Sequence, residues 1–309
     1  MKKFRAIIVG PGNIFNKAYL PFILDLEGLN IVGIVGRSEE KLKKYKEMYN
    51  IDTYTDIDKA IVLKPDCAFV HTSTNSHYEI VKKLLFNNIN VYVDKPLTDD
   101  LEKTKELVNL AMDRSLILTI GFNRRYAPMY QMASNSFGRL GPDLYIMEKN
   151  RSDGIRDDAK FTIYDDFIHV VDTLCYLMGN IDSTNIINVS ISKENNSLKN
   201  ITVTISSDNA IAIGLMHRNS GKDYERLEIH GNGRSIVVDD MDNIKIMDNN
   251  GVYIRSFKSW DSISYRRGFV GTVKNFLKSL DEKKSNNDEL ICSLKTHQLV
   301  DDILRRIDS

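Results

Sequence analysis

The stretch Arg5-Ala-Ile-Ile-Val-Gly10-Pro-Gly12-Asn-Ile-Phe15 decides the fold of the first half of the chain. An apolar run ends in two glycines spaced two residues apart, and a helical pattern follows from about Asn16 to Leu26. In this order of strand, glycine turn and helix, the backbone can approach a pyrophosphate, and the helix N-terminus supplies N–H donors. Phe15 stands where a third small residue is usual, so the packing of the helix on the strand should differ. The stretch predicts a dinucleotide-binding site.

Apolar runs and helical patterns alternate up to residue 121, and this rhythm predicts a parallel sheet covered by helices on both faces. The expected strands are Arg5–Gly10, Ile31–Gly36, Cys67–Thr72, Val91–Asp94 and Leu116–Gly121. Besides the first helix, the expected helices are Glu39–Tyr49, about His77 to Asn88, and Leu101–Asp113. We therefore expect a doubly wound Rossmann domain over residues 1–121.

Beyond about residue 180, short strands follow one another with turn residues between them, which is typical of antiparallel pairing. The expected strands are Asn185–Ser192, Asn200–Ser206, Ala210–His217, Tyr224–His230 and Arg234–Asp239. Helices are expected at about Phe161–Met178, Phe269–Leu280 and Asp288–Ile307. Residues 122–309 should thus form an α+β domain with a large, mostly antiparallel, open sheet.

Composition excludes several classes of protein. The 309 residues include 42 Lys plus Arg and 42 Asp plus Glu, and this zero net charge argues against a partner such as nucleic acid. No apolar run approaches the roughly 20 residues of a transmembrane helix, so no membrane association is expected. The three cysteines are far apart in sequence, which indicates neither a disulfide framework nor a zinc site. We expect a globular, cytoplasmic protein.

The end of the second strand reads Gly36-Arg37-Ser38. An enzyme that uses NAD usually has a carboxylate here, which binds the ribose 2′-hydroxyl. A glycine followed by a cation and a hydroxyl instead suits a 2′-phosphate, so NADP is the preferred cofactor and NAD the alternative. Ser38 can also serve as the N-cap of the following helix.

Two further patterns suggest a catalytic site. Asp94-Lys95-Pro96 directly follows a strand, where ligands of open α/β sheets bind. Asp165 and His169 are four residues apart on an expected helix, so the carboxylate can orient the imidazole. A buried core histidine satisfied by a nearby acid is the alternative. A metal bound by Asp165, His169 and Asp172 is a weaker one, and no metal site is expected.

Together these features resemble the glucose–fructose oxidoreductase / inositol dehydrogenase (Gfo/Idh/MocA) family over essentially the whole chain. The hallmarks are the Gly-x-Gly turn, an acid-Lys-Pro triplet after a middle strand, and Asp-x-x-x-His on a helix of the second domain. The strings Phe122-Asn-Arg-Arg-Tyr126 and Thr72-Ser-Thr-Asn-Ser-His77 also look similar. Asp94 replaces the usual Glu, and Phe167 stands where Gly is common.

The resemblance implies hydride transfer between a nicotinamide cofactor and a carbinol carbon of a sugar, cyclitol or related small molecule. His169 would be the acid/base, Asp165 would orient it, and Lys95 would bind the reacting oxygen. The implied cofactor-binding residues are Gly10, Gly12, Asn13, Ile14, Gly36, Arg37, Ser38, Thr72, Ser73, Thr74, His77, Asp94, Lys95, Asn123 and Arg124. His77 is equally well explained as part of a helix start, and Asn123 and Arg124 could contact substrate instead. Arg151, Arg156 and Tyr164 are expected on the substrate side.

Two other functions are compatible with the same fold. The same fold could serve a non-catalytic sensor of a dinucleotide or sugar, but a sensor has no need of a proton relay. A semialdehyde dehydrogenase would need an activated cysteine, and Cys67, Cys175 and Cys292 do not look activated.

In Ala210-Ile-Ala-Ile-Gly-Leu-Met216 both faces of the strand are apolar, which predicts a homodimer or homotetramer formed through the open face of the sheet.

Overall fold

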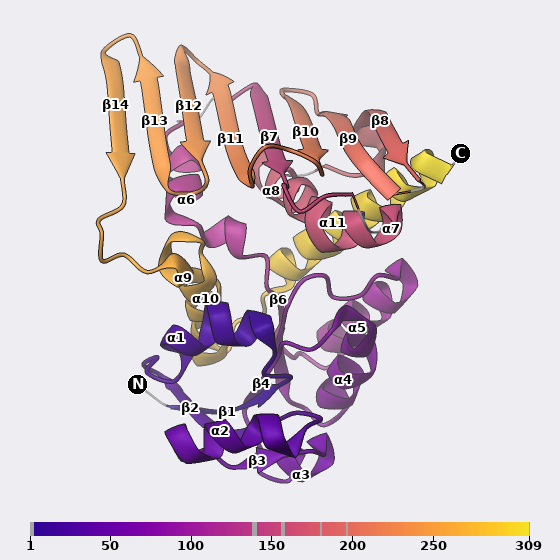
Figure 1. Cartoon of the computed structure of the whole chain (residues 1–309), viewed down its shortest axis with the longest axis vertical. Coiled ribbons are helices and arrows are strands. Elements are labelled where there is room, and N and C mark those ends of the chain that lie inside the picture. Colours follow the sequence, from indigo (N-terminus) through magenta and orange to yellow (C-terminus); the bar gives the residue numbers. More distant parts are fainter. Residues whose placement is uncertain (1–2, 138–140, 156–157, 180, 196, 309) are drawn as a thin grey trace. The chain divides into compact units, whose positions relative to one another are not determined.

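The computed structural model describes residues 3–137, 141–155, 158–179, 181–195 and 197–308, and it divides into two compact units (Figure 1). The first unit consists of Met1–Gly121 and Phe269–Leu294, and the second of Phe122–Gly268 and Lys295–Ser309. The boundary expected between residues 121 and 122 agrees with this division. The segment 269–294, which we expected in the second domain, instead belongs to the first unit.

The first unit contains a six-stranded sheet in the order β3-β2-β1-β4-β5-β6, and all neighbouring strands pair in parallel. The strands are β1 Phe4–Val9, β2 Leu29–Val35, β3 Thr53–Tyr54, β4 Cys67–Val70, β5 Asn90–Val93 and β6 Leu118–Ile120. This confirms the doubly wound fold. The sequence did not predict β3, because two residues are too short for a periodic pattern to show.

The helices of this unit begin and end at residues suited to these positions. They are η1 Phe15–Tyr19, α1 Leu20–Ile23, α2 Glu39–Tyr49, α3 Ile57–Ile61, α4 Thr74–Phe86, α5 Leu101–Asp113 and α10 Phe269–Glu282. The Ser38 hydroxyl caps α2 by accepting a hydrogen bond from the Lys41 N–H, and the Asp100 carboxylate caps α5. Helix α2 ends at Asn50, which has a left-handed φ of 53°.

Helix α10 belongs to the first unit because its apolar face completes that unit's core. Val273, Phe276, Leu277 and Leu280 are buried in one cluster with residues of β1, β4 and β5. The rings of Phe276 and Phe69 pack edge to face with their centroids 5.5 Å apart. The first unit is thus made from two segments of the chain.

The second unit contains an eight-stranded sheet in the order β14-β13-β12-β11-β7-β10-β9-β8. Its strands are β7 Leu144–Asn150, β8 Ile186–Glu194, β9 Ser197–Ser206, β10 Ile211–His217, β11 Tyr224–Gly231, β12 Arg234–Asp239, β13 Asn243–Asp248 and β14 Gly251–Ser256. Only β7 and β10 pair in parallel among these neighbours; the others are antiparallel. The mostly antiparallel sheet is confirmed, and β7, β13 and β14 are additions to it.

Helices cover one face of this sheet (Figure 1). In this unit lie η2 Asn123–Tyr126, α6 Pro128–Asn135, α7 Ala159–Thr162, η3 Ile163–Phe167, α8 Ile168–Met178, η4 Ser183–Asn185, α9 Ile263–Arg266 and most of α11 Asn287–Asp308. Along β10, Ala212 and Met216 are buried on the covered face, while Ile211 on the other face is 45% exposed. Among the described residues, no helix is both long and apolar enough to cross a membrane.

Candidate active site

The predicted cofactor residues of the first unit lie at the carboxyl ends of neighbouring strands. Gly10 follows β1, Gly36 follows β2, Thr72 comes after β4 and Asp94 follows β5. Backbone hydrogen bonds continue the sheet past the strand ends, from the N–H groups of Gly10, His71, Asp94 and Gly121 to the carbonyls of Val35, Val9, Val70 and Val93. These segments are therefore held at one edge, where open α/β sheets bind ligands.

The turn from Gly10 to Gly12 fits a dinucleotide. Gly10 has a φ of +81°, and a Cβ there would lie 2.3 Å from Cγ2 of Thr72, so only glycine fits. Around Gly12, by contrast, a Cβ would meet nothing closer than 3.9 Å, which leaves room for a phosphate to approach the backbone. The helical conformation begins at Asn13, directly after the turn. The hydroxyl of Thr72 is buried and has no hydrogen-bond partner among the described residues.

Phe15, at the usual third small position, is accommodated by a change of helix type. It is the first residue of η1, a π-helical turn, and it is fully buried. Its ring packs against that of His71, with the centroids 5.3 Å apart. Insertions of this kind are frequent at functional sites. The departure expected from the sequence is therefore a local widening of the helix around a buried aromatic ring.

The end of β2 is crowded at the position of the carboxylate that is usual in NAD enzymes. A Cβ on Gly36 would lie 3.0 Å from Cδ2 of Leu42 and 3.4 Å from Cδ of Pro11. Arg37 is exposed and has no ion pair with any described residue. Ser38 caps α2 as expected, and its hydroxyl hydrogen is free to donate to another group.

Asp94 is fixed in a buried network of hydroxyl and imidazole groups. The Tyr19 hydroxyl donates to Oδ1 of Asp94 at 2.6 Å, and Nδ1 of His71 lies 2.8 Å from Oδ2. The hydroxyls of Tyr19 and Tyr92 are 3.0 Å apart. Burial alone would raise the pKa of Asp94, but the hydrogen bonds and charge of His71, with the Tyr19 bond, outweigh it and lower the pKa. The residue before Lys95 is thus an anchored carboxylate.

Lys95 and its neighbours form a second tethered segment. Lys95 is half-buried, and its peptide bond to Pro96 is cis. The imidazole of His77 lies 2.9 Å from the carbonyl oxygen of Pro96 and 3.0 Å from that of Thr72. Burial lowers the pKa of His77, although these carbonyls oppose the effect. His77 lies inside the first turn of α4, which begins at Thr74 after Ser73, and it joins the loops after β4 and β5.

In the second unit, the predicted catalytic residues Asp165 and His169 lie where the π-helical turn η3 continues into α8. Asp165 lies in η3, the π-helical turn, and is exposed, whereas His169 is the second residue of α8 and is 9% exposed. Tyr164 in η3 is buried. A hydrogen bond from the His169 imidazole to the Asp165 carboxylate stays a prediction. Arg156 lies outside the described residues.

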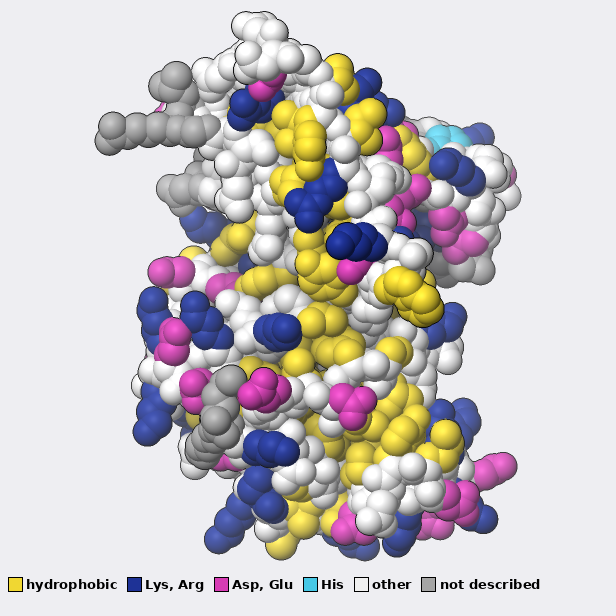
Figure 2. All heavy atoms as spheres, turned by 90° about the vertical axis from the view of Figure 1, so that its left-hand side faces the viewer, with side chains coloured by type: hydrophobic (Ala, Val, Ile, Leu, Met, Phe, Trp, Pro, Cys, Tyr) yellow, Lys and Arg dark blue, Asp and Glu magenta, His cyan; other side chains and the backbone are white. Residues whose placement is uncertain are grey.

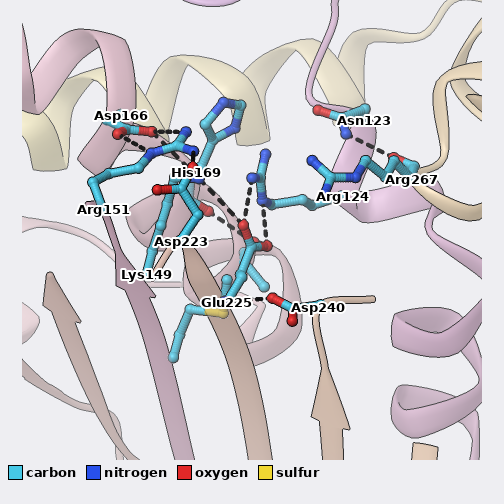
Figure 3. A network of polar contacts seen from close by, with 12 residues as sticks. Asn123, Arg124, Lys149, Arg151, Asp166, His169, Asp223, Glu225, Asp240 and Arg267 are labelled. Atoms are coloured by element: carbon cyan, nitrogen blue, oxygen red, sulfur yellow. Dashed lines mark hydrogen bonds and ion pairs between the residues drawn. The ribbon is translucent and has the colours of Figure 1, made fainter. Parts of the chain in front are cut away.

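The neighbouring Asp166 is the centre of one half of a buried charge network (Figure 3). Nε and Nη2 of Arg151 donate to its carboxylate at 2.7 and 2.8 Å, and Nη1 of Arg218 donates at 2.7 Å. Arg151 uses its third nitrogen to bind Asp223 at 3.1 Å. Each nitrogen of Arg151 thus makes one hydrogen bond within the network, and contact of Arg151 with a substrate stays a prediction.

Glu225 on β11 is the centre of the other half. Nε and Nη2 of Arg124 both donate to its carboxylate at 2.6 Å, and the Tyr130 hydroxyl donates at 3.1 Å. Burial would raise the pKa of Glu225, but Arg124 and Lys149 hold it well below its usual range. The bidentate pair joins residues 101 positions apart in sequence.

Lys149, on β7, lies between the two halves. Its Nζ is 3.3 Å from Oδ1 of Asp166 and 3.3 Å from Oε2 of Glu225, longer than the arginine contacts to the same carboxylates. Burial, and then the positive charge of Arg124, lower its pKa to about 8, against the pull of the two carboxylates. Buried Lys149, Arg124 and Arg218 face only two buried carboxylates. The buried part of the network therefore has one more cation than anion.

Asn123 and Arg267 complete this region. The Asn123 side chain donates to the backbone carbonyl of Arg267 at 2.6 Å. The guanidinium of Arg267 is exposed and has no hydrogen bond or ion pair with the described residues. Figure 3 shows the Arg267 side chain extending toward that of Arg124. Binding of the cofactor by Asn123 and Arg124 stays a prediction.

Comparisons with known proteins agree with this geometry. Residues 4–122 match the model of an oxidoreductase family with an NAD-binding Rossmann fold, Gfo/Idh/MocA, and residues 128–249 match the YceM-like C-terminal domain. The protein YceM of Salmonella typhimurium is 33% identical over 279 residues, which are 90% of this chain and 89% of that protein. This chain belongs to the Gfo/Idh/MocA family.

Other members of the Gfo/Idh/MocA family are similar to different extents. The structure of a dehydrogenase, MviM, from Clostridium difficile has a TM-score of 0.91 at 29% identity, covering 99% of this chain and 100% of that one. The scyllo-inositol 2-dehydrogenase (NAD+) of Bacillus subtilis is 28% identical over 153 residues, which are 47% of this chain and 44% of that enzyme. The resemblance inferred from the motifs is confirmed.

The sequence did not single out several groups of this Gfo/Idh/MocA site. Tyr19 and His71 look like ordinary apolar and strand-end residues, and only their approach to Asp94 makes them part of the site. Lys149 lies in an otherwise apolar alternation, Tyr145-Ile-Met-Glu-Lys, and a cation at an inward position was the available signal. Glu225 has the same signal at an inward position of β11.

The three cysteines differ in burial, and Cys292 is half-buried. Cys67 and Cys175 are buried, and burial raises the pKa of the Cys67 thiol. No group of three or more His, Cys, Asp or Glu residues is arranged to hold a metal ion among the described residues.

Proposed function

We propose that this protein is a nicotinamide-dependent dehydrogenase that oxidises a carbinol carbon of a sugar, cyclitol or related small molecule, or reduces the corresponding carbonyl. The observation that carries the proposal is that a member of this oxidoreductase family retains Lys95, Asp165 and His169 together. The nicotinamide would supply the hydride acceptor or donor. The chain itself must move the hydroxyl proton and stabilise the charge that develops on oxygen.

His169 is proposed to exchange that proton, because an imidazole changes its protonation near neutral pH. Asp165 orients the ring by accepting from one ring nitrogen. The Lys95 ammonium donates a hydrogen bond to the reacting oxygen, where it favours the developing negative charge. The anchored carboxylate of Asp94 limits the freedom of the backbone next to Lys95.

The test is single-turnover hydride transfer measured by cofactor fluorescence against a panel of polyols, sugars and sugar nucleotides. His169→Ala and Lys95→Ala should each slow transfer by about 100-fold or more. Asp165→Asn should lower activity with little effect on stability. His217→Ala, on β10, is the control and should leave activity unchanged. The cofactor Kd should stay the same in His169→Ala.

Two results would count against the proposal. Tight cofactor binding without turnover of any panel member would favour the alternative of a sensor. Full activity in His169→Ala would show that the histidine is a core residue only.

We also propose that NADP(H) binds more tightly than NAD(H). A side chain at Gly36 would be crowded by Leu42 and Pro11, and the unpaired Arg37 can form a fork with a 2′-phosphate. In Arg37→Ala the affinity for NADP should fall by about 10- to 100-fold, while the affinity for NAD should change little. Equal affinities of the wild type for both cofactors would contradict the proposal.

A homo-oligomer formed through the second sheet is proposed as well. On the uncovered face, Ile211 is 45% exposed, and at the edge strand β14 Val252 and Ile254 are 61% and 65% exposed. Trp260, beyond β14, is 96% exposed. Figure 2 shows hydrophobic side chains gathered on the side of the molecule where β14 lies. Light scattering at micromolar concentration should give a dimer or tetramer; a monomer would contradict this.

A further inference from the structure

In the buried part of the charge network of the second unit, Lys149, Arg124 and Arg218 face two buried carboxylates, while the solvent-exposed Asp153 and Asp223 pair with Arg218 and Arg151. Lys149 shares both of its carboxylates with arginines that bind them at shorter distances. Glu225 and Asp166 are therefore largely satisfied without it. A buried cation in this position is costly unless another negative group comes close.

Two arginines of this region, Arg124 near Lys149 and Arg267 beyond it, present unused donors. Nη1 of Arg124 has no hydrogen bond to any described residue and is accessible to solvent, since the other two nitrogens hold Glu225. In Figure 3 this nitrogen points away from Glu225, on the side where the His169 ring lies. The exposed guanidinium of Arg267 extends toward the same place and is unpaired in the described part of the chain.

Two guanidinium groups that extend toward one another repel unless an anion lies near both. Arginine forks match the planar oxygens of a carboxylate and the oxygens of a phosphate. A neutral polyol offers only hydroxyls, which cannot compensate the surplus charge. The region is thus complementary to a ligand with one negatively charged oxygen group.

We propose that the substrate carries an anionic group, a carboxylate or a phosphate, and that Arg124 and Arg267 bind this group while Lys149 adds to the positive potential. The inference rests on the proposed function, because it assigns a substrate class to the site of His169. It makes Arg267, a residue that no sequence motif marked, a determinant of substrate specificity. It also gives the charge network a role in binding in addition to its role in folding.

The experiment compares matched sugars that differ in charge. Calorimetric titrations of the protein saturated with oxidised cofactor would use D-glucose, D-glucuronate and D-glucose 6-phosphate, and the same trios built on galactose and mannose. In at least one trio a charged member should bind at least about 10-fold more tightly than the neutral sugar. Uronates and sugar phosphates then distinguish carboxylate from phosphate as the source of the charge.

Variants separate this effect from general electrostatics. Arg267→Met should weaken binding of the preferred charged sugar by about 10- to 100-fold and leave the neutral sugar unaffected. Arg255→Met is the control, because Arg255 on β14 is also exposed and unpaired in the described part of the chain, and it should change nothing. Cofactor Kd, measured without sugar, should be the same in all three proteins.

Three outcomes would overturn the inference. The first is equal or absent binding of the charged members in every trio. The second is an equal loss in Arg255→Met and Arg267→Met. The third is weaker cofactor binding in Arg267→Met, which would assign the guanidinium to the dinucleotide. Turnover of neutral sugars without any charge preference would reject the anionic substrate class and leave the proposed dehydrogenase function standing. Charged sugars that bind but never react would support the anion site and count against the dehydrogenase function.

Discussion

The two units stabilise their buried polar groups by different means. In the first, one carboxylate, Asp94, is held by a tyrosine hydroxyl and an imidazole. In the second, the carboxylates of Glu225 and Asp166 are held by arginines, and Lys149 adds a surplus charge. A single carboxylate held mainly by hydroxyl and imidazole hydrogen bonds should lose little stability when one partner changes, whereas a network of several buried fixed charges depends on their balance. The second network should therefore be the more sensitive to substitution.

Removal of one charge from the second network should have the largest effect. Glu225→Gln leaves Arg124 and Lys149 buried without their carboxylate, so the free energy of unfolding should fall by about 3–5 kcal/mol. Urea denaturation measures this. Glu228→Gln is the matched control, since Glu228 lies on the same strand and pairs with the half-exposed Arg226, and it should cost less than about 1 kcal/mol. Similar losses in the two variants would remove the basis of the comparison.

The hydrogen-bonded network of the first unit should respond less. Asp94→Asn keeps the shape of the side chain and one acceptor for Tyr19, so the loss should be about 1–3 kcal/mol. Tyr19→Phe, which removes a single hydroxyl, should cost about 1 kcal/mol. The same urea titrations apply. A loss in Asp94→Asn as large as that in Glu225→Gln would show that Asp94 and His71 act as a strong ion pair.

The smallest effect is expected where the surplus charge itself is removed. Lys149→Met leaves two buried arginines facing two buried carboxylates, so stability at pH 7 should rise or fall by less than about 1 kcal/mol. A loss above about 2 kcal/mol would mean that the lysine is needed to balance the network.

The pH dependence of stability in the wild type and in Lys149→Met tests whether folding lowers the pKa of Lys149. Folding lowers the pKa of Lys149 from 10.5 to about 8. Between these two values the unfolded chain binds more protons than the folded one, so stability rises with pH. Urea titrations from pH 7 to 10.5 should show wild type gaining stability relative to Lys149→Met above pH 8, with a constant difference below it. A constant difference throughout would contradict the lowered pKa.

Much of the first unit could be predicted because its helix caps and glycine turn are encoded by neighbouring residues. Helices α2 and α5 have the predicted bounds, since Ser38 and Asp100 are strong N-caps followed by amphipathic sequences. The glycine turn and the triplet at Lys95 are likewise contiguous in sequence. Such features can be read from a few residues, and they place Gly10, Gly36, Thr72 and Asp94 at the carboxyl edge of the sheet.

Long-range pairings were not predictable in the same way. The amphipathic pattern of α10 shows that one face is buried, but it does not show which core receives it. The pair of Arg124 and Glu225 has no local signal at all, because its members are 101 residues apart. The buried Lys149 interrupts the apolar alternation of β7, so the pattern did not predict this strand.

The return of α10 to the first unit also constrains the order in which the chain can fold. During synthesis the nascent chain emerges from its N-terminus at about 5–20 residues per second, and N-terminal domains usually fold first. Here Val273 and Phe276, which belong to the core of the first unit, emerge only after the whole second sheet. The first unit must therefore wait on the order of ten seconds or more with part of its core exposed to solvent. In the ribosome-bound chain, the second sheet can form before the core beneath the nucleotide-binding sheet is complete.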